Sequence, residues 1–133
     1  MHAKLLFSIV LLALSTQFSA CGRSEISFSA DVMPILQASC LECHNNTGEG
    51  VVASKFSVVD YASVMKGTSL GPVVVPGSSI SSTLYRVVAG KTSPEIRMPP
   101  HHSDALAEGR GESLGAEQIE IIAGWIDQGA KDN

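Results

Sequence analysis

Two cysteines and a histidine lie together in the pentapeptide Cys40-Leu41-Glu42-Cys43-His44. In a C-x-x-C-H pattern, two thiols three residues apart can each bond one vinyl group of the same porphyrin, and the histidine that follows can bring its imidazole to the iron. The pattern occurs once in the chain. It therefore predicts one covalently attached haem c, held by Cys40 and Cys43, with His44 as an axial ligand of the iron.

The second axial position of the iron decides whether such a haem carries electrons or binds a small molecule. We predict that Met98 occupies it. Met98 lies in an irregular segment that Pro99 and Pro100 stiffen, and the chain between it and His44 is long enough to reach the opposite face of a haem. A histidine and methionine ligand pair raises the reduction potential and is typical of electron carriers.

Other side chains compete for this position. Met33 lies within two helical turns of Cys40, too near to reach the far haem face, and Met65 has the spacing of a packed helix residue. His101 or His102 would instead give a bis-histidine haem of lower potential. The two cysteines and this histidine pair could also suggest zinc, but they lack the usual H-x₃₋₅-H spacing. A thioredoxin-like C-x-x-C would require a βαβ pattern, which the sequence does not show.

The composition favours one small domain with a bulky cofactor. The chain has 133 residues, of which 44% are hydrophobic and only 5% aromatic. A core with so few rings is thin unless something large and flat fills it, as a haem would. The formal net charge of −4 argues against a nucleic-acid partner, since phosphate binding requires clustered Lys and Arg.

The N-terminus has the pattern of an export signal. A basic start is followed by an apolar run from Leu5 to Leu14, which is too short to span a bilayer and suits a signal peptide. Phe18-Ser19-Ala20-Cys21-Gly22 then resembles a bacterial lipobox. We therefore expect a lipoprotein signal peptide over residues 1–20 and acylation of Cys21. The alternative is a plain secretory signal or uncleaved anchor that leaves Cys21 as an odd thiol.

Acylation of Cys21 would place the protein at a membrane. Several acyl chains on one residue anchor far more firmly than one. We expect an exported, periplasmic protein with a lipid anchor, in the outer membrane if the cell is Gram-negative. Residues 21–29 are short, polar and without helical periodicity, which predicts a tether, and residues 30–131 then form the haem domain.

Hydrophobic periodicity predicts helices joined by long loops. The first begins at Asp31 as N-cap and delivers Cys40 to the haem. The last carries Gly124, whose cost inside a helix suggests that another backbone, that of the first helix, crosses there. The predicted elements are a helix over 31–40, a loop over 45–50, a helix over 59–67, an extended segment over 71–77, a helix from Ser78 to Gly90 that buries Ile80, a loop over 91–112 and a helix over 116–128.

Four stretches together resemble the small cytochrome c domain often called planctomycete-type. They are the C-x-x-C-H pentapeptide, residues 71–77 with Ser82-Thr83-Leu84-Tyr85, Met98-Pro99-Pro100, and residues 125–130. The resemblance covers about residues 28–131. It implies an all-α, class I cytochrome c-like fold, with axial ligands His44 and Met98. With the periodicity above, we expect about four short helices with long loops.

The resemblance also implies electron transfer between a donor and an acceptor redox protein. Six-coordinate iron leaves no vacancy for a substrate, so we expect an electron carrier and not an enzyme. The hydrogen-bond partner of the second His44 nitrogen is expected to be a backbone carbonyl in the loop that contains Pro72. The alternative is a haem sensor or peroxidase-like protein in which Met98 is displaced or never bound.

Overall fold

The computed structural model describes residues 24–100, 107 and 112–133, and these residues form helices and no strand. The predicted all-α fold class is confirmed. Within the described ranges, none of the helices has the length and apolar character that a membrane span requires. The elements in chain order are the π-helical turn η1 (Phe28–Val32), α1 (Met33–Ser39), α2 (Glu49–Ser54), α3 (Tyr61–Lys66), α4 (Thr83–Val88), the 3₁₀ turn η2 (Pro94–Ile96) and α6 (Ala116–Asp127).

Several predicted features lie outside the described residues. These are the signal peptide over residues 1–20, the acylated Cys21 and the alternative ligands His101 and His102. They remain predictions.

The first helical run begins earlier than the sequence indicated. Ser27 is its N-cap, because its Oγ accepts a hydrogen bond from the N–H of Ala30 at 3.1 Å. Asp31 lies in the first turn, and its carboxylate accepts from the N–H of Ser27 at 2.8 Å. Ser27 and Asp31 therefore cap the helix together, each accepting a backbone N–H, whereas the sequence predicts Asp31 alone as the cap. A π-helical turn precedes α1, and Pro34 lies at the start of α1.

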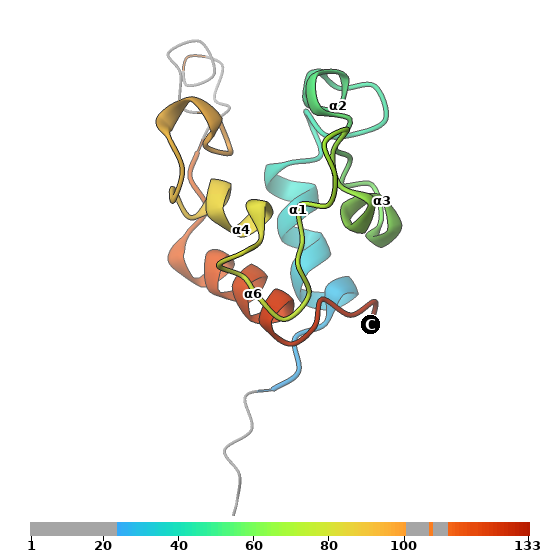
Figure 1. Cartoon of the computed structure of the whole chain (residues 1–133), viewed down its shortest axis with the longest axis vertical. Helices are drawn as coiled ribbons and strands as arrows, with labels where there is room; N and C mark the ends of the chain where they lie inside the picture. Colours follow the sequence, from blue (N-terminus) through green and yellow to red (C-terminus); the bar gives the residue numbers. More distant parts are fainter. Residues whose placement is uncertain (1–23, 101–106, 108–111) are drawn as a thin grey trace, which may run out of the picture.

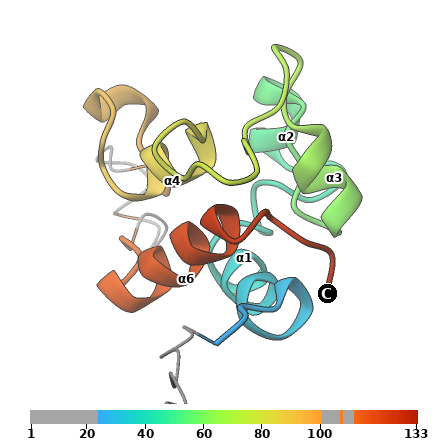
Figure 2. The same cartoon turned by 60° about the horizontal axis from the view of Figure 1, so that its bottom comes forward.

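Helix α6 packs against η1 and α4 and carries the centre of the core (Figures 1 and 2). Trp125 on α6 is fully buried, with ring centroids 5.2 Å from Phe28 and 6.4 Å from Tyr61. Phe28 and Tyr61 meet edge to face at 5.2 Å. Three of the few aromatic residues therefore join η1, α3 and α6 into one unit. Aliphatic side chains complete the core: Val32, Ile35, Leu36, Val58, Val64, Leu84, Val88, Ile122 and Ile126.

Helix α3 begins and ends where the sequence predicts. Asp60 accepts a hydrogen bond from the N–H of Ser63 at 2.7 Å as N-cap, and Gly67 ends the helix with φ 79°. The hydrogen bonds from Ser63 hold the pKa of the Asp60 carboxyl below its usual value.

The helix predicted from Ser78 is shorter than expected. Its N-cap is Ser82, and Ile80, predicted to be buried, is 75% exposed. Asp127 explains the difference, because its carboxylate accepts from both the N–H and the Oγ of Ser79, at 2.7 and 3.1 Å. These bonds hold residues 78–82 in turns against α6. The predicted loop over 45–50 also differs at its end, where α2 begins at Glu49.

The predicted tether differs from the structure over residues 24–29. Ile26 packs against the core and Phe28 is 3% exposed. Gly124 does mark a close approach, but the partner is not the backbone of the first helix. A Cβ at Gly124 would lie 2.5 Å from Cδ1 of Ile26. The N-terminal segment, which the sequence predicts to be a tether, fills that space.

Candidate haem site

A cavity of about 770 Å³ lies between the end of α1, α2, the segment after η2 and the start of α6. Its volume is typical of a cofactor pocket. The structure brings all four predicted haem residues, Cys40, Cys43, His44 and Met98, into its lining. The other lining residues are Ala38, Ser39, Glu42, Glu49, Gly50, Ala53, Pro99, Pro100, Glu112, Ser113, Gly115 and Gln118.

The two cysteines lie in a tight turn that follows α1. The N–H of Cys40 still bonds to the Leu36 carbonyl at 2.9 Å, and the N–H of His44 bonds to the Cys40 carbonyl at 2.9 Å. This turn places both thiols and the imidazole on the wall of one cavity. Neither cysteine is in a disulfide, and the Cys43 thiol donates to the Glu49 carboxylate at 3.6 Å.

The two thiols have different environments. Burial raises the pKa of the Cys40 thiol to about 11, and the nearby Cys43 adds to the shift because a second negative charge is unfavourable there. Before any haem is attached, Cys40 is therefore a protonated thiol at neutral pH. Conversion to a thioether replaces the S–H with an S–C bond, so that this partly buried group no longer titrates.

The orientation of the His44 ring is set by one hydrogen bond. Its Nδ1 lies 2.9 Å from the backbone oxygen of Phe56. A carbonyl oxygen can only accept, so Nδ1 carries the hydrogen and Nε2 keeps a lone pair for a metal. The predicted kind of partner, a backbone carbonyl, is correct, but the predicted location near Pro72 is wrong. The backbone of His44 is held as well, since its carbonyl accepts from the N–H of Val58 at 2.9 Å.

Two glycines leave room for this arrangement. A Cβ at Gly50 would lie 2.7 and 2.8 Å from Cε1 and Nε2 of His44. A Cβ at Gly48 would overlap the backbone carbonyl of Cys43. Only glycine therefore fits at these two positions, where the chain at the start of α2 comes close to the C-x-x-C-H turn. The sequence predicts a loop at both glycines and does not indicate this role.

Met98 lies at the edge of the cavity with 36% of its surface exposed. Its N–H donates to the carbonyl of Val87 at 3.2 Å, which fixes this segment against α4. Pro99 and Pro100 follow it in the cavity wall. The thioether therefore comes from a different part of the chain than His44, as a second axial ligand would.

These residues fit a covalently bound haem. The site combines two thiols, an imidazole whose Nε2 keeps its lone pair, and a thioether around one large cavity. Gly50 keeps side-chain atoms away from the His44 ring on one side. Phe56 contributes through its backbone oxygen, a role that no side-chain pattern could have indicated, while its ring packs at 5.4 Å from the imidazole.

Comparison with known proteins agrees with this chemistry. Residues 40–102 match a family model described as planctomycete cytochrome C. The matched range begins at Cys40 and includes Met98. Neither the search of curated proteins nor the search of solved structures found a significant match.

Proposed function

We propose that the protein is a one-electron carrier with one haem c, because residues 40–102 match the family model of planctomycete cytochrome C. Cys40 and Cys43 hold the haem by thioether bonds, and His44 and Met98 bind its iron. When bound, the haem supplies a one-electron redox centre. The observation that carries the proposal is the convergence of these four residues on one cavity.

A hydrogen bond within the chain fixes the orientation of His44, the proposed axial ligand, which influences the reduction potential of the haem. The Nδ1–H of His44 donates to the Phe56 carbonyl, which holds the imidazole plane and makes Nε2 a better donor. Burial of the surrounding core supports this geometry: Phe56 is 8% exposed and Val58 is fully buried. A ligand held in this way moves little between oxidation states, which favours rapid electron transfer.

The proposed setting is a membrane surface outside the cytoplasm. The lipobox-like sequence around Cys21 supports acylation there. The resemblance to c-type cytochromes also implies export, because their haem is attached outside the cytoplasm. The carrier would then exchange electrons with a donor and an acceptor redox protein in the periplasm, either alone or as the haem subunit of a larger redox complex.

Redox titration with optical spectra tests the ligand assignment. In the wild-type protein we expect the sulfur-to-iron charge-transfer band of a methionine-ligated haem. Met98→Ala should abolish this band and lower the reduction potential, since a weaker or absent ligand no longer favours the ferrous state. Met65→Ala, a methionine of α3 that packs against the core, should preserve both. An unchanged band in Met98→Ala would refute Met98 as ligand.

The irregular segment around Met98 favours one alternative function. A ligand in a segment without regular structure can be displaced more easily than one held in a helix. The protein would then be a haem sensor or a peroxidase-like enzyme. Rapid and complete binding of carbon monoxide by the reduced wild-type protein would support this alternative, whereas slow or absent binding supports the closed carrier.

A further inference from the structure

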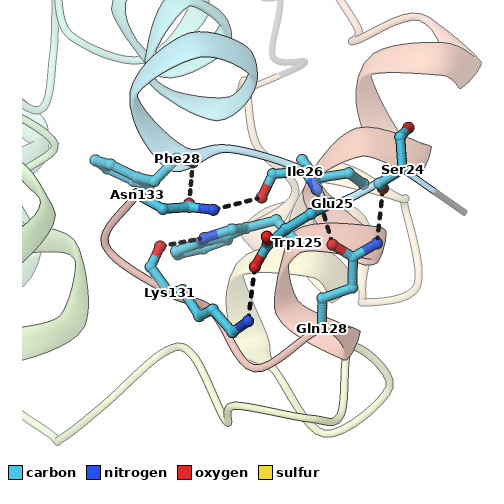
Figure 3. Close-up of polar contacts among 8 residues, drawn as sticks. All are labelled: Ser24, Glu25, Ile26, Phe28, Trp125, Gln128, Lys131 and Asn133. Carbon is cyan, nitrogen blue, oxygen red and sulfur yellow. Dashed lines mark hydrogen bonds and ion pairs between the residues drawn. The ribbon is translucent and has the colours of Figure 1, made fainter.

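Residues 24–29 and 128–133 are joined by a set of contacts that we name the terminal clamp (Figure 3). Gln128 bonds on both sides: its Oε1 accepts from the N–H of Ile26 at 2.8 Å, and its Nε2 donates to the carbonyl of Ser24 at 3.3 Å. Lys131 pairs with Glu25, Nζ to Oε1, at 2.6 Å. The N-terminal segment is thus attached from Ser24 onward.

Asn133 closes the clamp. Its Oδ1 accepts from the N–H of Phe28 at 2.8 Å, and its backbone oxygen accepts from the Oγ of Ser27 at 2.7 Å and the N–H of Ser29 at 2.9 Å. The segment between Gln128 and Asn133 is fixed to the core, because Nε1 of Trp125 donates to the carbonyl of Lys131 at 2.9 Å. The ion pair alone is exposed and weak, but the clamp has many bonds and rests on the buried Phe28.

The clamp and the haem cavity lie at opposite ends of the domain. Gly115 and Gln118, at the start of α6, line the cavity, whereas Gln128, just after its end, belongs to the clamp. Thirteen residues at 1.5 Å each separate Gly115 from Gln128 by about 20 Å. η1 and α1 also connect the two ends of the domain, since they lead from Phe28 in the clamp to Cys40 at the cavity. Figure 1 shows the described N-terminal segment at the bottom and α2 at the top.

Little chain remains between the clamp and the proposed lipid. Ser24 is three residues after Cys21, so the two can be at most about 11 Å apart. We propose that the terminal clamp holds the haem cavity on the side of the domain turned away from the membrane, so that its redox partners dock from the aqueous phase. This inference rests on the acylation of Cys21 that is part of the proposed function.

The surface beside the clamp is acidic, which supports the same orientation. A groove of about 540 Å³ runs between the N-terminal segment and α6, and its lining contains no Lys or Arg. Its charged residues repel anionic lipid headgroups, so the domain would not lie on that side against the bilayer. They are Asp31, Glu117, Glu120 and Asp127, whereas the charge of Glu25, which also lines the groove, is paired with Lys131.

The orientation can be measured by energy transfer from the bilayer to the haem. The mature protein, acylated at Cys21 and carrying haem, is placed in a bilayer of phosphatidylethanolamine and phosphatidylglycerol with a fluorescent headgroup label. Quenching of the label's fluorescence increases steeply as the distance between the label and the haem decreases. We expect weak quenching by the wild type and at least a twofold rise for Gln128→Ala/Lys131→Ala/Asn133→Ala, which frees the domain to tilt. Equal quenching by both proteins would overturn the proposal.

Two further proteins separate tilt from loss of structure. Gln37→Ala/Lys66→Ala changes an exposed glutamine and an exposed lysine outside the clamp and should quench like the wild type. Ten Gly and Ser residues inserted before Ser24 leave the clamp intact but lengthen the tether, and should raise quenching without affecting stability. Quenching that the insertion does not change would contradict a short, fixed connection.

Failure of the proposed function can be recognised separately. Mass spectrometry of the N-terminal peptide reports whether Cys21 is acylated, and the absorption spectrum reports whether haem is attached. Without natural acylation, a maleimide lipid coupled to Cys21 gives the same comparison, because haem occupies the other two cysteines. Without haem, the lipid is coupled to Cys21 in a Cys40→Ser/Cys43→Ser background, so that no other thiol reacts, and neutron reflectometry measures the tilt of the domain. A clamped domain stands upright, and an equally tilted parent protein and clamp variant would overturn the proposal.

Discussion

Nδ1 of His44 lies 2.9 Å from the backbone oxygen of Phe56, twelve residues further along the chain. This contact decides which ring nitrogen can bind iron and in which plane the ring lies. It joins the C-x-x-C-H turn to the segment after α2, and α2 approaches the ring so closely that only glycine fits at position 50. The geometry of the ligand therefore depends on a backbone atom and on a missing side chain.

Gly50→Ala should disturb the His44 ligand without preventing folding. The added methyl would lie 2.7 Å from Cε1 and 2.8 Å from Nε2 of His44, so the ring or α2 must shift. Alanine also favours the helix by up to about 1 kcal/mol, which offsets part of the cost of about 1–3 kcal/mol that overpacking adds. We expect an altered ferric EPR spectrum and a shifted reduction potential. Gly115→Ala is the control, because it lines the same cavity with no contact closer than 3.7 Å. Identical spectra for the two variants would contradict this role of Gly50.

The haem-free protein should lose stability at alkaline pH because of Cys40. Burial, and secondarily Cys43, raises the pKa of this thiol from 9.0 to about 11 in the folded state. Well below pH 9 the thiol is protonated in both the folded and the unfolded state, so it does not change the free energy of unfolding. As the pH rises from 9 towards 11, the unfolded chain releases the proton and the folded chain retains it. The free energy of unfolding should therefore fall by on the order of 2 kcal/mol across this range.

Urea unfolding of the haem-free protein between pH 8 and pH 11 measures this loss. Cys40→Ala is the control, since other groups that titrate in this range remain in both proteins. The difference between the two proteins should grow with pH. In the haem-bound protein the thiol is a thioether, so the Cys40 contribution should vanish. Parallel curves for wild type and Cys40→Ala would show that burial does not shift this pKa.

Local patterns in the sequence predicted the elements that local interactions form. The N-cap Asp60 and the C-terminal Gly67 of α3 are examples, since each acts within one turn of its own helix. The haem motif is another, because its chemistry needs three residue types within five positions. The convergence of Met98 on the same cavity was also expected from its loop and its prolines.

Contacts between distant segments account for what the sequence did not predict. Residues 24–29 looked like a tether because Ile26 and Phe28 alone give no periodicity, and their burial depends on residues about a hundred positions away. Ile80 was assigned to a helix because nothing local shows that Asp127 holds Ser79 in a turn. The Phe56 carbonyl has no sequence signature at all.

Tyr61→Phe should weaken the fold and leave the haem unaffected. The hydroxyl of Tyr61 donates to the carbonyl of Ala130 at 2.8 Å, and its removal should cost about 1 kcal/mol. The ring and its edge contacts with Phe28 and Trp125 remain. Tyr85→Phe is the matched control, because it keeps the ring that faces Lys91 and should change stability by only a few tenths of a kcal/mol. Denaturant unfolding measures both, and a shifted haem spectrum in Tyr61→Phe would contradict a purely structural role.

Gly124 and Ile26 should show strong energetic coupling in a double-mutant cycle. A methyl at Gly124 would lie 2.5 Å from Cδ1 of Ile26, so overpacking should cost about 1–3 kcal/mol, against a helix-propensity gain of about 1 kcal/mol. Gly124→Ala should therefore destabilise the wild type. In the Ile26→Ala background the space is open, and the same substitution should stabilise by about 1 kcal/mol. Denaturant unfolding of the four proteins gives the coupling energy. A Gly124→Ala effect of equal sign and size in both backgrounds would mean that the N-terminal segment does not pack on α6.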